Sequence, residues 1–398
     1  MADLQHAVQQ VLDQLVASGE EVGLQAAVYL DGELAADAVA GVKGRGVGDL
    51  VAPDTLFTIY SCSKGVIASA VHLLAQRGLV DYDRPVASYW PEFGTAGKDQ
   101  VTVAQAMNHL AGIPQAPVVA GLTQSELWCD LDRVVAETAR LVPHFAPGTT
   151  SYYHALTIGW ILEGLVRQVD GRSLGQVIRE EIAGPLGITD ELFLGTPPEV
   201  HHRMAAPYDA PVETPPVPAA EAPSPDPLAA AILPAEEALP VLLNRPVLRQ
   251  AQVPAVNVSA TARALAKHYA ALVGEVEGCR LLRAGQLEAI FSRQADLPDR
   301  FVNLVWQDQQ TPRVLGYSRS TGRENQEFYC GPGLRSFGHS GYGGSYGFAD
   351  PDRRLGFGYT KTLLPGLVQP APGVPSRTMQ PEEMSRVRVM KAVYAALA

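Results

Sequence analysis

The sequence has few charged side chains and no cluster of basic ones. Charged residues make up 18% of the 398 positions, and the formal net charge is −11 at pH 7. An acidic chain without a basic patch is poorly suited to bind nucleic acid or an anionic membrane surface. We therefore expect neither of these partners and look instead for a small-molecule ligand.

Long apolar runs are absent as well. No uninterrupted run is long enough to span a bilayer. The start, from Met1 to His6, lacks the basic stretch followed by an apolar one that marks a signal peptide. These absences predict a cytoplasmic protein without a membrane span.

Cysteine is scarce and scattered. The four thiols follow no metal-ligand spacing and are expected to be reduced; they belong to Cys62, Cys129, Cys279 and Cys330. His201 and His202 are adjacent, but no third ligand stands at a suitable spacing. The sequence predicts no metal site and no cofactor, and it leaves the oligomeric state open.

What is present is enough apolar material for a large core. Apolar residues make up 46% of the chain, and 37 glycines and 31 prolines indicate long loops. Apolar spacing predicts strands near both ends, in 24–42 around the turn Asp31-Gly32 and again in 335–360. Helical spacing marks both ends and the middle, in 4–18, 66–74, 101–110, 130–141, 155–168, 258–273, 284–291 and from Pro381 onward.

Prolines break every period between residues 195 and 256. A stretch of this composition predicts a long loop or a partly extended excursion. It would either reach over the mouth of an active site or form a surface insertion.

The stretch 57–65 runs from an apolar, strand-like lead-in into a helical pattern and contains a Ser-x-x-Lys at Ser61 and Lys64. If a helix begins at or just after Ser61, the two side chains lie one turn apart on the same face. A desolvated lysine can take the serine proton and activate the hydroxyl as a nucleophile. The helix N-terminus favours negative charge that develops beside Ser61. Taken alone, the tetrapeptide also fits a capped helix with a solvated lysine.

Two further stretches complete a pattern. Tyr153 to Ala155 follows a Pro-Gly-Thr and precedes an apolar helix, and His339 to Gly341 lies in a Gly-rich strand pattern, where a substrate can approach the backbone closely. With Ser61 and Lys64, these motifs resemble the serine β-lactamase and penicillin-binding-protein superfamily. Within it, the chain is similar to the class C-like esterases and transacylases. The resemblance covers most of the chain, although 195–256 has no counterpart.

The resemblance implies a role for each matched position. Ser61 would be the nucleophile, Lys64 its close partner and Tyr153 the general base, with a phenol pKa lowered by the neighbouring lysine. The backbone N–H groups of Ser61 and Tyr342 would form the oxyanion hole. The substrate-binding strand would be formed by His339, Ser340 and Gly341.

The same resemblance implies an α+β fold. An antiparallel β-sheet would be flanked by the N- and C-terminal helices, with an inserted, largely helical lobe. The sheet domain would comprise residues 1–80 and 300–398. The helical lobe would comprise 81–299, including the Pro-rich region of about 195–256.

Two departures from the family pattern narrow the range of substrates that we expect. His339 stands where the β-lactamases have a lysine, and with an ordinary pKa of about 6.5 it would be mostly neutral, so carboxylate recognition is weakened. Ala155 replaces an amide side chain that would hydrogen-bond a substrate amide. Both changes favour an ester or another activated acyl group.

We therefore expect serine-dependent acyl transfer through an acyl-enzyme on Ser61, with hydrolysis of a carboxylic ester as the first hypothesis. The alternative is a transacylase that passes the acyl group to an amine or alcohol, as relatives in secondary metabolism do. Residual β-lactamase or peptidase activity is a third possibility. A catalytically silent binding protein is a fourth, and it is disfavoured because the nucleophile, Lys64 and Tyr153 are all present.

Several residue assignments have alternatives. Tyr152 is the rival of its neighbour for the base, and His339 would otherwise be a structural histidine that bonds a backbone carbonyl. Cys62 lies more than a quarter of a turn away from the nucleophile, which argues against a reactive thiol. Trp90 and Trp128 would line an acyl pocket or, in the simpler interpretation, pack in the core.

Overall fold

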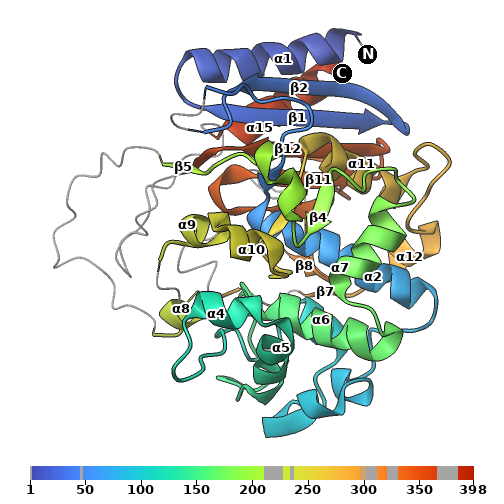
Figure 1. Ribbon diagram of the computed structural model, residues 1–398. Helices are drawn as coiled ribbons and strands as arrows, with labels where there is room; N and C mark the ends of the chain where they lie inside the picture. The colour runs from blue at the N-terminus through green and yellow to red at the C-terminus, as the bar shows by residue number, and fades with distance from the viewer. Residues whose placement is uncertain are drawn as a thin grey trace, which may run out of the picture.

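The computed structural model describes residues 2–44, 48–209, 227–233, 237–295, 297, 299–300, 312–320, 330–364 and 384–398. Within them, eight strands form one antiparallel sheet, of which β1, β2, β11 and β12 are labelled in the upper half of Figure 1. From one edge to the other these strands are β2 Glu33–Gly41, β1 Gly23–Leu30, β12 Leu355–Lys361, β11 Tyr346–Asp350, β10 Phe337–Ser340, β9 Tyr317–Arg319, β8 Arg313–Val314 and β7 Gln294–Ala295. The predicted α+β class with an antiparallel sheet is confirmed.

Two tight hairpins organise the centre and one edge of the sheet. β1 and β2 meet at Leu30 and Glu33 across Asp31 and Gly32, which both have positive φ, 52° and 86°. This conformation matches the right-handed twist of the strands and suits an Asp-Gly pair. β11 and β12 pair across residues 351–354. Both hairpins were predicted from the alternation of apolar residues and the turn signals.

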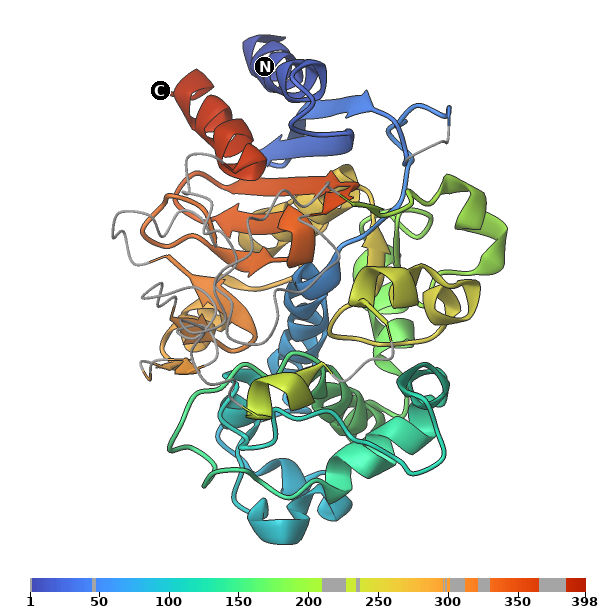
Figure 2. The same ribbon diagram turned by 90° about the vertical axis from the view of Figure 1, so that its left-hand side faces the viewer.

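The two terminal helices cover one face of the sheet. α1 (Ala2–Ala17) and α15 (Ser385–Ala396) lie side by side, as Figure 2 shows. Their apolar stripes pack together onto the aromatic residues of β11 and β12, and include Leu4, Val8, Leu12, Leu15, Val387, Val389, Met390 and Val393. The predicted N-terminal helix is confirmed. Pro381, where the last helix was expected to begin, lies outside the described residues.

The opposite face of the sheet is covered by α11 (Ala262–Val273), with α2 (Ser63–Gln76) beside it. α11 comes very close to β12, because a Cβ on Gly356 or Gly358 would lie 2.2 Å from a carbonyl oxygen of the helix. α2 runs between the sheet and the helical part of the molecule (Figure 2) and is buried along most of its length. The domain boundaries drawn from the sequence stay a prediction.

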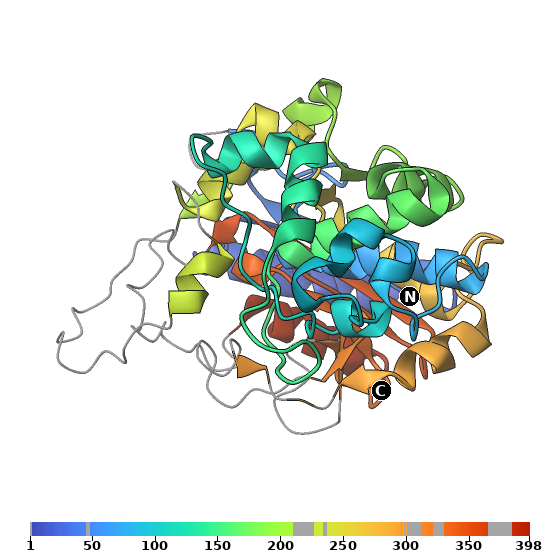
Figure 3. The ribbon, with the colours of Figure 1, turned by 90° about the horizontal axis from the view of Figure 1, so that it is seen from below.

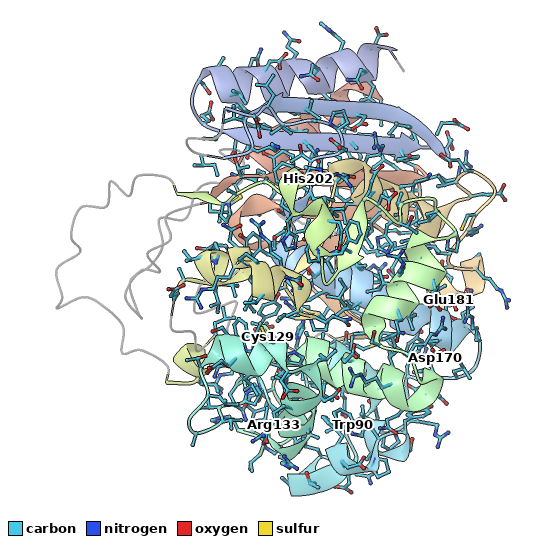
Figure 4. All side chains as sticks on the ribbon, in the orientation of Figure 1. Trp90, Cys129, Arg133, Asp170, Glu181 and His202 are labelled. Atoms are coloured by element: carbon cyan, nitrogen blue, oxygen red, sulfur yellow. The ribbon has the colours of Figure 1, made fainter. Side chains whose placement is uncertain are left out.

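The helical part lies below the sheet in Figure 1, and Figure 3 views it from below. Its regular segments are α3 Val103–Met107, α4 Gln124–Cys129, α5 Leu131–Arg140, α6 Thr157–Asp170, α7 Leu174–Val177 and a π-helical turn Ile178–Ala183. Arg172 joins two of these segments through ion pairs of 2.5 Å to Asp170 and 2.9 Å to Glu181, which lie near each other in Figure 4. Trp90 and Trp128 are both buried core residues.

Several predicted boundaries were wrong. The helix expected over 101–110 ends at Met107, and the helix expected over 258–273 begins only at Ala262. The Thr261 side chain caps this helix by accepting a hydrogen bond from the backbone N–H of Ala264, and the three residues before Thr261 form β6 (Val258–Ala260). A side-chain cap of this kind fixes the first turn, and the apolar run of a buried strand cannot be told from a helix by periodicity alone.

The prediction for 195–256 was wrong in part, because described residues of this stretch form short regular segments. They are the 3₁₀ turn Pro198–Arg203, β5 Tyr208–Asp209, α8 Pro227–Ile232, α9 Leu239–Asn244 and α10 Pro246–Gln250. Proline is tolerated in the first turn of a helix, where no N–H is needed for the ladder. Residues 210–226 and 234–236 of this stretch lie outside the described residues.

Smaller elements complete the fold. β6 pairs with β3 (Phe57–Thr58) and β4 (Leu192–Leu194), and β13 (Leu363–Leu364) pairs with β5. α12 (Ala284–Phe291) has the predicted bounds. In the part of the chain that the structure describes, no helix combines the length and the apolar character needed to cross a membrane.

The contact between α11 and β12 yields a stability prediction. Replacing Gly358 with alanine forces a Cβ against the Ala262 carbonyl oxygen, 2.2 Å away. We expect Gly358→Ala to lower the free energy of unfolding by about 1–3 kcal/mol, the usual effect of overpacking, in urea denaturation. The control is Gly285→Ala in α12, where no atom lies within 4 Å of the new Cβ. Equal stability of the two variants would contradict the tight helix-sheet contact.

Candidate active site

The Ser-x-x-Lys motif lies on a strand-to-helix turn. β3 leads through Ile59, whose N–H donates to the Val258 carbonyl at 2.9 Å, into a 3₁₀ turn Tyr60–Cys62, and α2 begins at Ser63. Tyr60 has a φ of 47°, a left-handed conformation that is costly for a bulky side chain. The turn therefore presents Ser61 at the N-terminal end of a buried helix, as the sequence predicted.

Ser61 and Lys64 are in direct contact. The Lys64 amine donates to Ser61 Oγ at 3.1 Å and to the Ala255 carbonyl at 3.1 Å. Lys64 is only 1% exposed. Burial lowers the pKa of Lys64 well below its ordinary value, and the positive charge of Arg313 lowers it further. The lowered pKa favours the neutral amine, whose lone pair can accept a proton.

Tyr153, and not Tyr152, is the tyrosine brought to Ser61. The Tyr153 hydroxyl is hydrogen-bonded to Ser61, and its ring centroid lies 4.9 Å from the Lys64 amine. Tyr152 instead packs in a small apolar cluster with Ala155 and Ile232. The spatial arrangement thus fits the residue singled out in the sequence, although its catalytic role stays a prediction.

The expected direction of the Tyr153 pKa was wrong. Burial raises the pKa of Tyr153 to about 12, and this effect exceeds the opposing influence of Arg313 and of the hydrogen bond to Ser61. A lowered phenol pKa would require a charged lysine beside the ring. Burial disfavours the ammonium form of Lys64 as well, so the phenol keeps its proton.

The end of β10 packs directly against the turn Tyr60–Cys62 that carries Ser61. The Cys62 thiol donates to the His339 carbonyl at 3.0 Å, and a Cβ on Gly341 would lie 2.3 Å from the Ile59 carbonyl oxygen. Only glycine allows this approach. Tyr342, the next residue, opens a 3₁₀ turn, so the two segments that carry the predicted oxyanion-hole amides are in contact.

His339 is neutral and buried. Its Nδ1 lies 2.7 Å from the Ser340 carbonyl oxygen, the backbone contact that the structural alternative required. Among the described residues, its Nε2 has no hydrogen-bond partner. Burial, together with the charge of Arg313, lowers the pKa of His339 well below its ordinary value. The side chain therefore offers no positive charge to a substrate carboxylate.

Sequence reasoning missed two charged residues of this region, Arg313 and Asp299. The Arg313 guanidinium lies 5.1 Å from the Tyr153 ring centroid, and Asp299 Oδ1 accepts the Tyr153 N–H at 3.2 Å. No motif marks them, because β8 has only two residues and Asp299 lies 146 positions from Tyr153. His109 is a further neighbour, whose ring lies 4.8 Å from that of Tyr153.

The other candidate ligands and nucleophiles have different partners. Burial raises the pKa of Cys62, which makes its thiol a poor nucleophile. His201 Nε2 and His202 Nδ1 contact backbone carbonyl oxygens at 3.0 and 2.9 Å, and Figure 4 labels His202 near the sheet, far from the helical part. Over the described ranges, no group of three or more metal-ligating side chains is found.

Comparisons with known proteins agree on one family. The family model described as Beta-lactamase matches residues 8–371. The chain is 36% identical over 364 residues to Esterase/beta-lactamase LipL of Mycobacterium tuberculosis (strain ATCC 25618 / H37Rv), an alignment that covers 85% of this chain and 76% of LipL. Esterase EstB of Burkholderia gladioli is 28% identical over 223 residues, which are 52% of this chain and 55% of EstB.

Solved structures with the same fold cover nearly the whole chain. A family VIII carboxylesterase superimposes with a TM-score of 0.83 at 31% identity, covering 99% of this chain and 97% of that one. A penicillin-binding-protein homolog from Caulobacter crescentus gives a TM-score of 0.80 at 32% identity, with coverages of 99% and 98%.

The contact between β10 and the turn that carries Ser61 can be tested with Gly341→Ala. The added Cβ must push β10 away from Ile59, and a displacement of about 1 Å at a reacting centre can cost about 100-fold in rate. We expect a loss of this order in kcat/KM for an activated ester. Gly274→Ala is the control, since no atom lies closer than 3.8 Å to its Cβ. Wild-type activity in Gly341→Ala would show that the close approach is unimportant.

Proposed function

Because the chain belongs to the β-lactamase family, we propose that it is a serine carboxylesterase that forms an acyl-enzyme on Ser61. The observation that carries this proposal is the buried contact of 3.1 Å between Ser61 Oγ and the Lys64 amine, with the Tyr153 hydroxyl bonded to the same serine. Before the reaction, the amine and the phenol beside the serine are neutral. The amine can then accept the serine proton as Oγ attacks the substrate. Named esterases and carboxylesterases among the relatives support a serine hydrolase.

In the proposed first step, the neutral Lys64 amine accepts the Ser61 proton while Oγ attacks the acyl carbonyl. The carbonyl oxygen becomes negative, and the backbone N–H groups of Ser61 and Tyr342 would donate hydrogen bonds to it. The base role thus moves from Tyr153 to Lys64, because burial lowers the pKa of the lysine and raises that of the tyrosine.

In the second half of acylation, the intermediate collapses and the ester C–O bond breaks. The leaving alkoxide takes a proton from the Tyr153 phenol, and the phenolate regains one from the Lys64 ammonium. Water then attacks the acyl-enzyme, and the same groups move its protons in the reverse sense. Ser61, Lys64 and Tyr153 end the cycle in the protonation states in which they began it.

The neutral environment supports an ester substrate. His339 is uncharged, and Ala155 packs with Tyr152 and Ile232 and has no hydrogen-bonding side chain. A substrate carboxylate would find no positive charge at His339, and a substrate amide would find no hydrogen-bonding side chain at Ala155. LipL carries both esterase and β-lactamase in its name, so a β-lactam is a necessary comparison substrate. Transfer to an amine or alcohol stays the alternative, since it shares the acylation step.

Intact-mass spectrometry after mixing with an activated short-chain ester tests the nucleophile. We expect an acyl-sized mass gain in the wild type and none in Ser61→Ala. The matched control is Ser63→Ala, which removes a buried hydroxyl in the same turn that accepts from the Val258 N–H at 3.1 Å but should leave the adduct intact. An adduct on Ser61→Ala would refute the assignment.

The fate of the adduct separates the alternatives. Decay in water alone supports the esterase, whereas decay that needs an added amine or alcohol supports the transacylase. Turnover of nitrocefin at a rate comparable with that of the ester would instead favour a β-lactamase.

Substitutions of Lys64 and Tyr153 test the proton transfers. General acid-base groups contribute about 10²–10⁴-fold, so we expect Lys64→Met and Tyr153→Phe each to slow acylation by at least about 100-fold in stopped-flow measurements. Tyr152→Phe should stay within a few-fold of the wild type, because this tyrosine packs away from Ser61. A Tyr152→Phe defect as large as that of Tyr153→Phe would reverse the assignment.

A further inference from the structure

Arg313 places a cation against Tyr153, one of the proposed catalytic residues. Its guanidinium lies 5.1 Å from the Tyr153 ring centroid, and its side chain is 11% exposed. A guanidinium over an aromatic face is attracted by the ring and also restricts its movement. The Lys64 amine lies 4.9 Å from the centroid of the same ring. The Tyr153 ring is thus in contact with both the guanidinium and the buried amine.

Asp299 ties this arginine to the backbone of Tyr153. Its Oδ1 accepts the Tyr153 N–H at 3.2 Å, and its Oδ2 lies 3.9 Å from Arg313. The next residue, Arg300, donates its backbone N–H to the Ser151 carbonyl at 3.0 Å. The two charged residues therefore hold the tyrosine through both its ring and its main chain.

The strand that carries Arg313 is fixed to the centre of the molecule. Arg313 Nη1 donates to Ser318 Oγ at 2.9 Å across the β8-β9 hairpin. At the tip of this hairpin, the Leu315 N–H donates to Asn108 Oδ1 at 2.6 Å, and its carbonyl oxygen lies 3.1 Å from His72 Nε2 on α2. The guanidinium is consequently anchored relative to the helix that carries Lys64.

We propose that Arg313 is a positioning residue for acyl transfer: it holds the Tyr153 ring against Lys64 and supplies a fixed positive charge that keeps the lysine amine free to accept the Ser61 proton. This role presupposes the acyl transfer on Ser61 proposed above. Asp299 partly offsets the charge and sets its strength at the lysine. Arg313 contacts no reacting atom in this role and acts through Tyr153 and Lys64.

The surroundings of Lys64 make the charge of Arg313 effective. Burial shifts the pKa of five titratable groups of this region toward the neutral form; these groups are Cys62, His109, Tyr153, Tyr269 and His339. Arg313 and Asp299 form the charged pair of this region. Charges act strongly on each other where water is excluded, and a like charge disfavours the ammonium form of the lysine.

The test is the pH dependence of kcat/KM for an activated ester, with the acid product quantified by chromatography so that the readout does not change with pH. The acid limb of this profile reports the base of the free enzyme. In Arg313→Gln, Lys64 should keep its proton to a higher pH, and the limb should move upward by about one pH unit or more. Arg313→Lys keeps the charge and loses the planar stacking, so its limb should stay near that of the wild type while the plateau falls.

Asp299→Asn should shift the acid limb in the direction opposite to the shift expected for Arg313→Gln. The amide oxygen can still accept the Tyr153 N–H, but the negative charge is gone, so the acid limb should move to lower pH. Arg319→Gln is the matched control: this arginine lies on the neighbouring strand β9 and stacks 4.7 Å from the Phe291 ring centroid. It should leave the limb in place. A purely structural role for Arg313 would lower the plateau and shift no limb.

The outcomes separate the two proposals. Without Ser61-dependent turnover in the wild type, the proposed function fails. The role of Arg313 then fails with it, because that role presupposes acyl transfer on Ser61. With normal wild-type turnover, an unmoved acid limb in Arg313→Gln, or limbs of Arg313→Gln and Asp299→Asn that move in the same direction, overturns the role of Arg313 alone.

Discussion

The burial of one lysine governs the chemistry available to this protein. Lys64 lies on a helix enclosed by the sheet on one side and by the helical part on the other, and its amine contacts Ser61 Oγ and the Ala255 carbonyl. An ammonium in such a place would lose the hydration that stabilises it in water. The amine is therefore favoured over its conjugate acid. Burial thus favours the basic form of a residue that is ordinarily charged at neutral pH.

The same burial explains why the surrounding groups are neutral. Tyr153 keeps its proton and His339 does not gain one, since each would have to become charged in a region of low dielectric. Apart from the pair Arg313 and Asp299, these groups are neutral, and neutral groups suit an uncharged ester carbonyl better than a carboxylate. Charge that develops during the reaction would then be stabilised by backbone N–H groups, which need no counter-ion.

Glycine provides the close contacts that hold these segments together. Gly341 lets the end of β10 approach the turn that carries Ser61, and Gly356 and Gly358 let α11 lie against the sheet. The Cys62 thiol adds a hydrogen bond to the His339 carbonyl in the same interface. A side chain at Gly341 would push β10 away from the turn that carries Ser61, and one at Gly356 or Gly358 would push α11 away from the sheet.

The sequence by itself determined what depends on neighbours a few positions apart. The stripe of α1, the hairpin at Asp31 and Gly32, and the one-turn spacing of Ser61 and Lys64 follow from periods of two and 3.6 residues. The tertiary structure alone decided the direction of the Tyr153 pKa and the presence of Arg313 and Asp299 beside it. The reason is physical: burial and charge act through space between residues far apart in the chain, and no local pattern records which of them will meet.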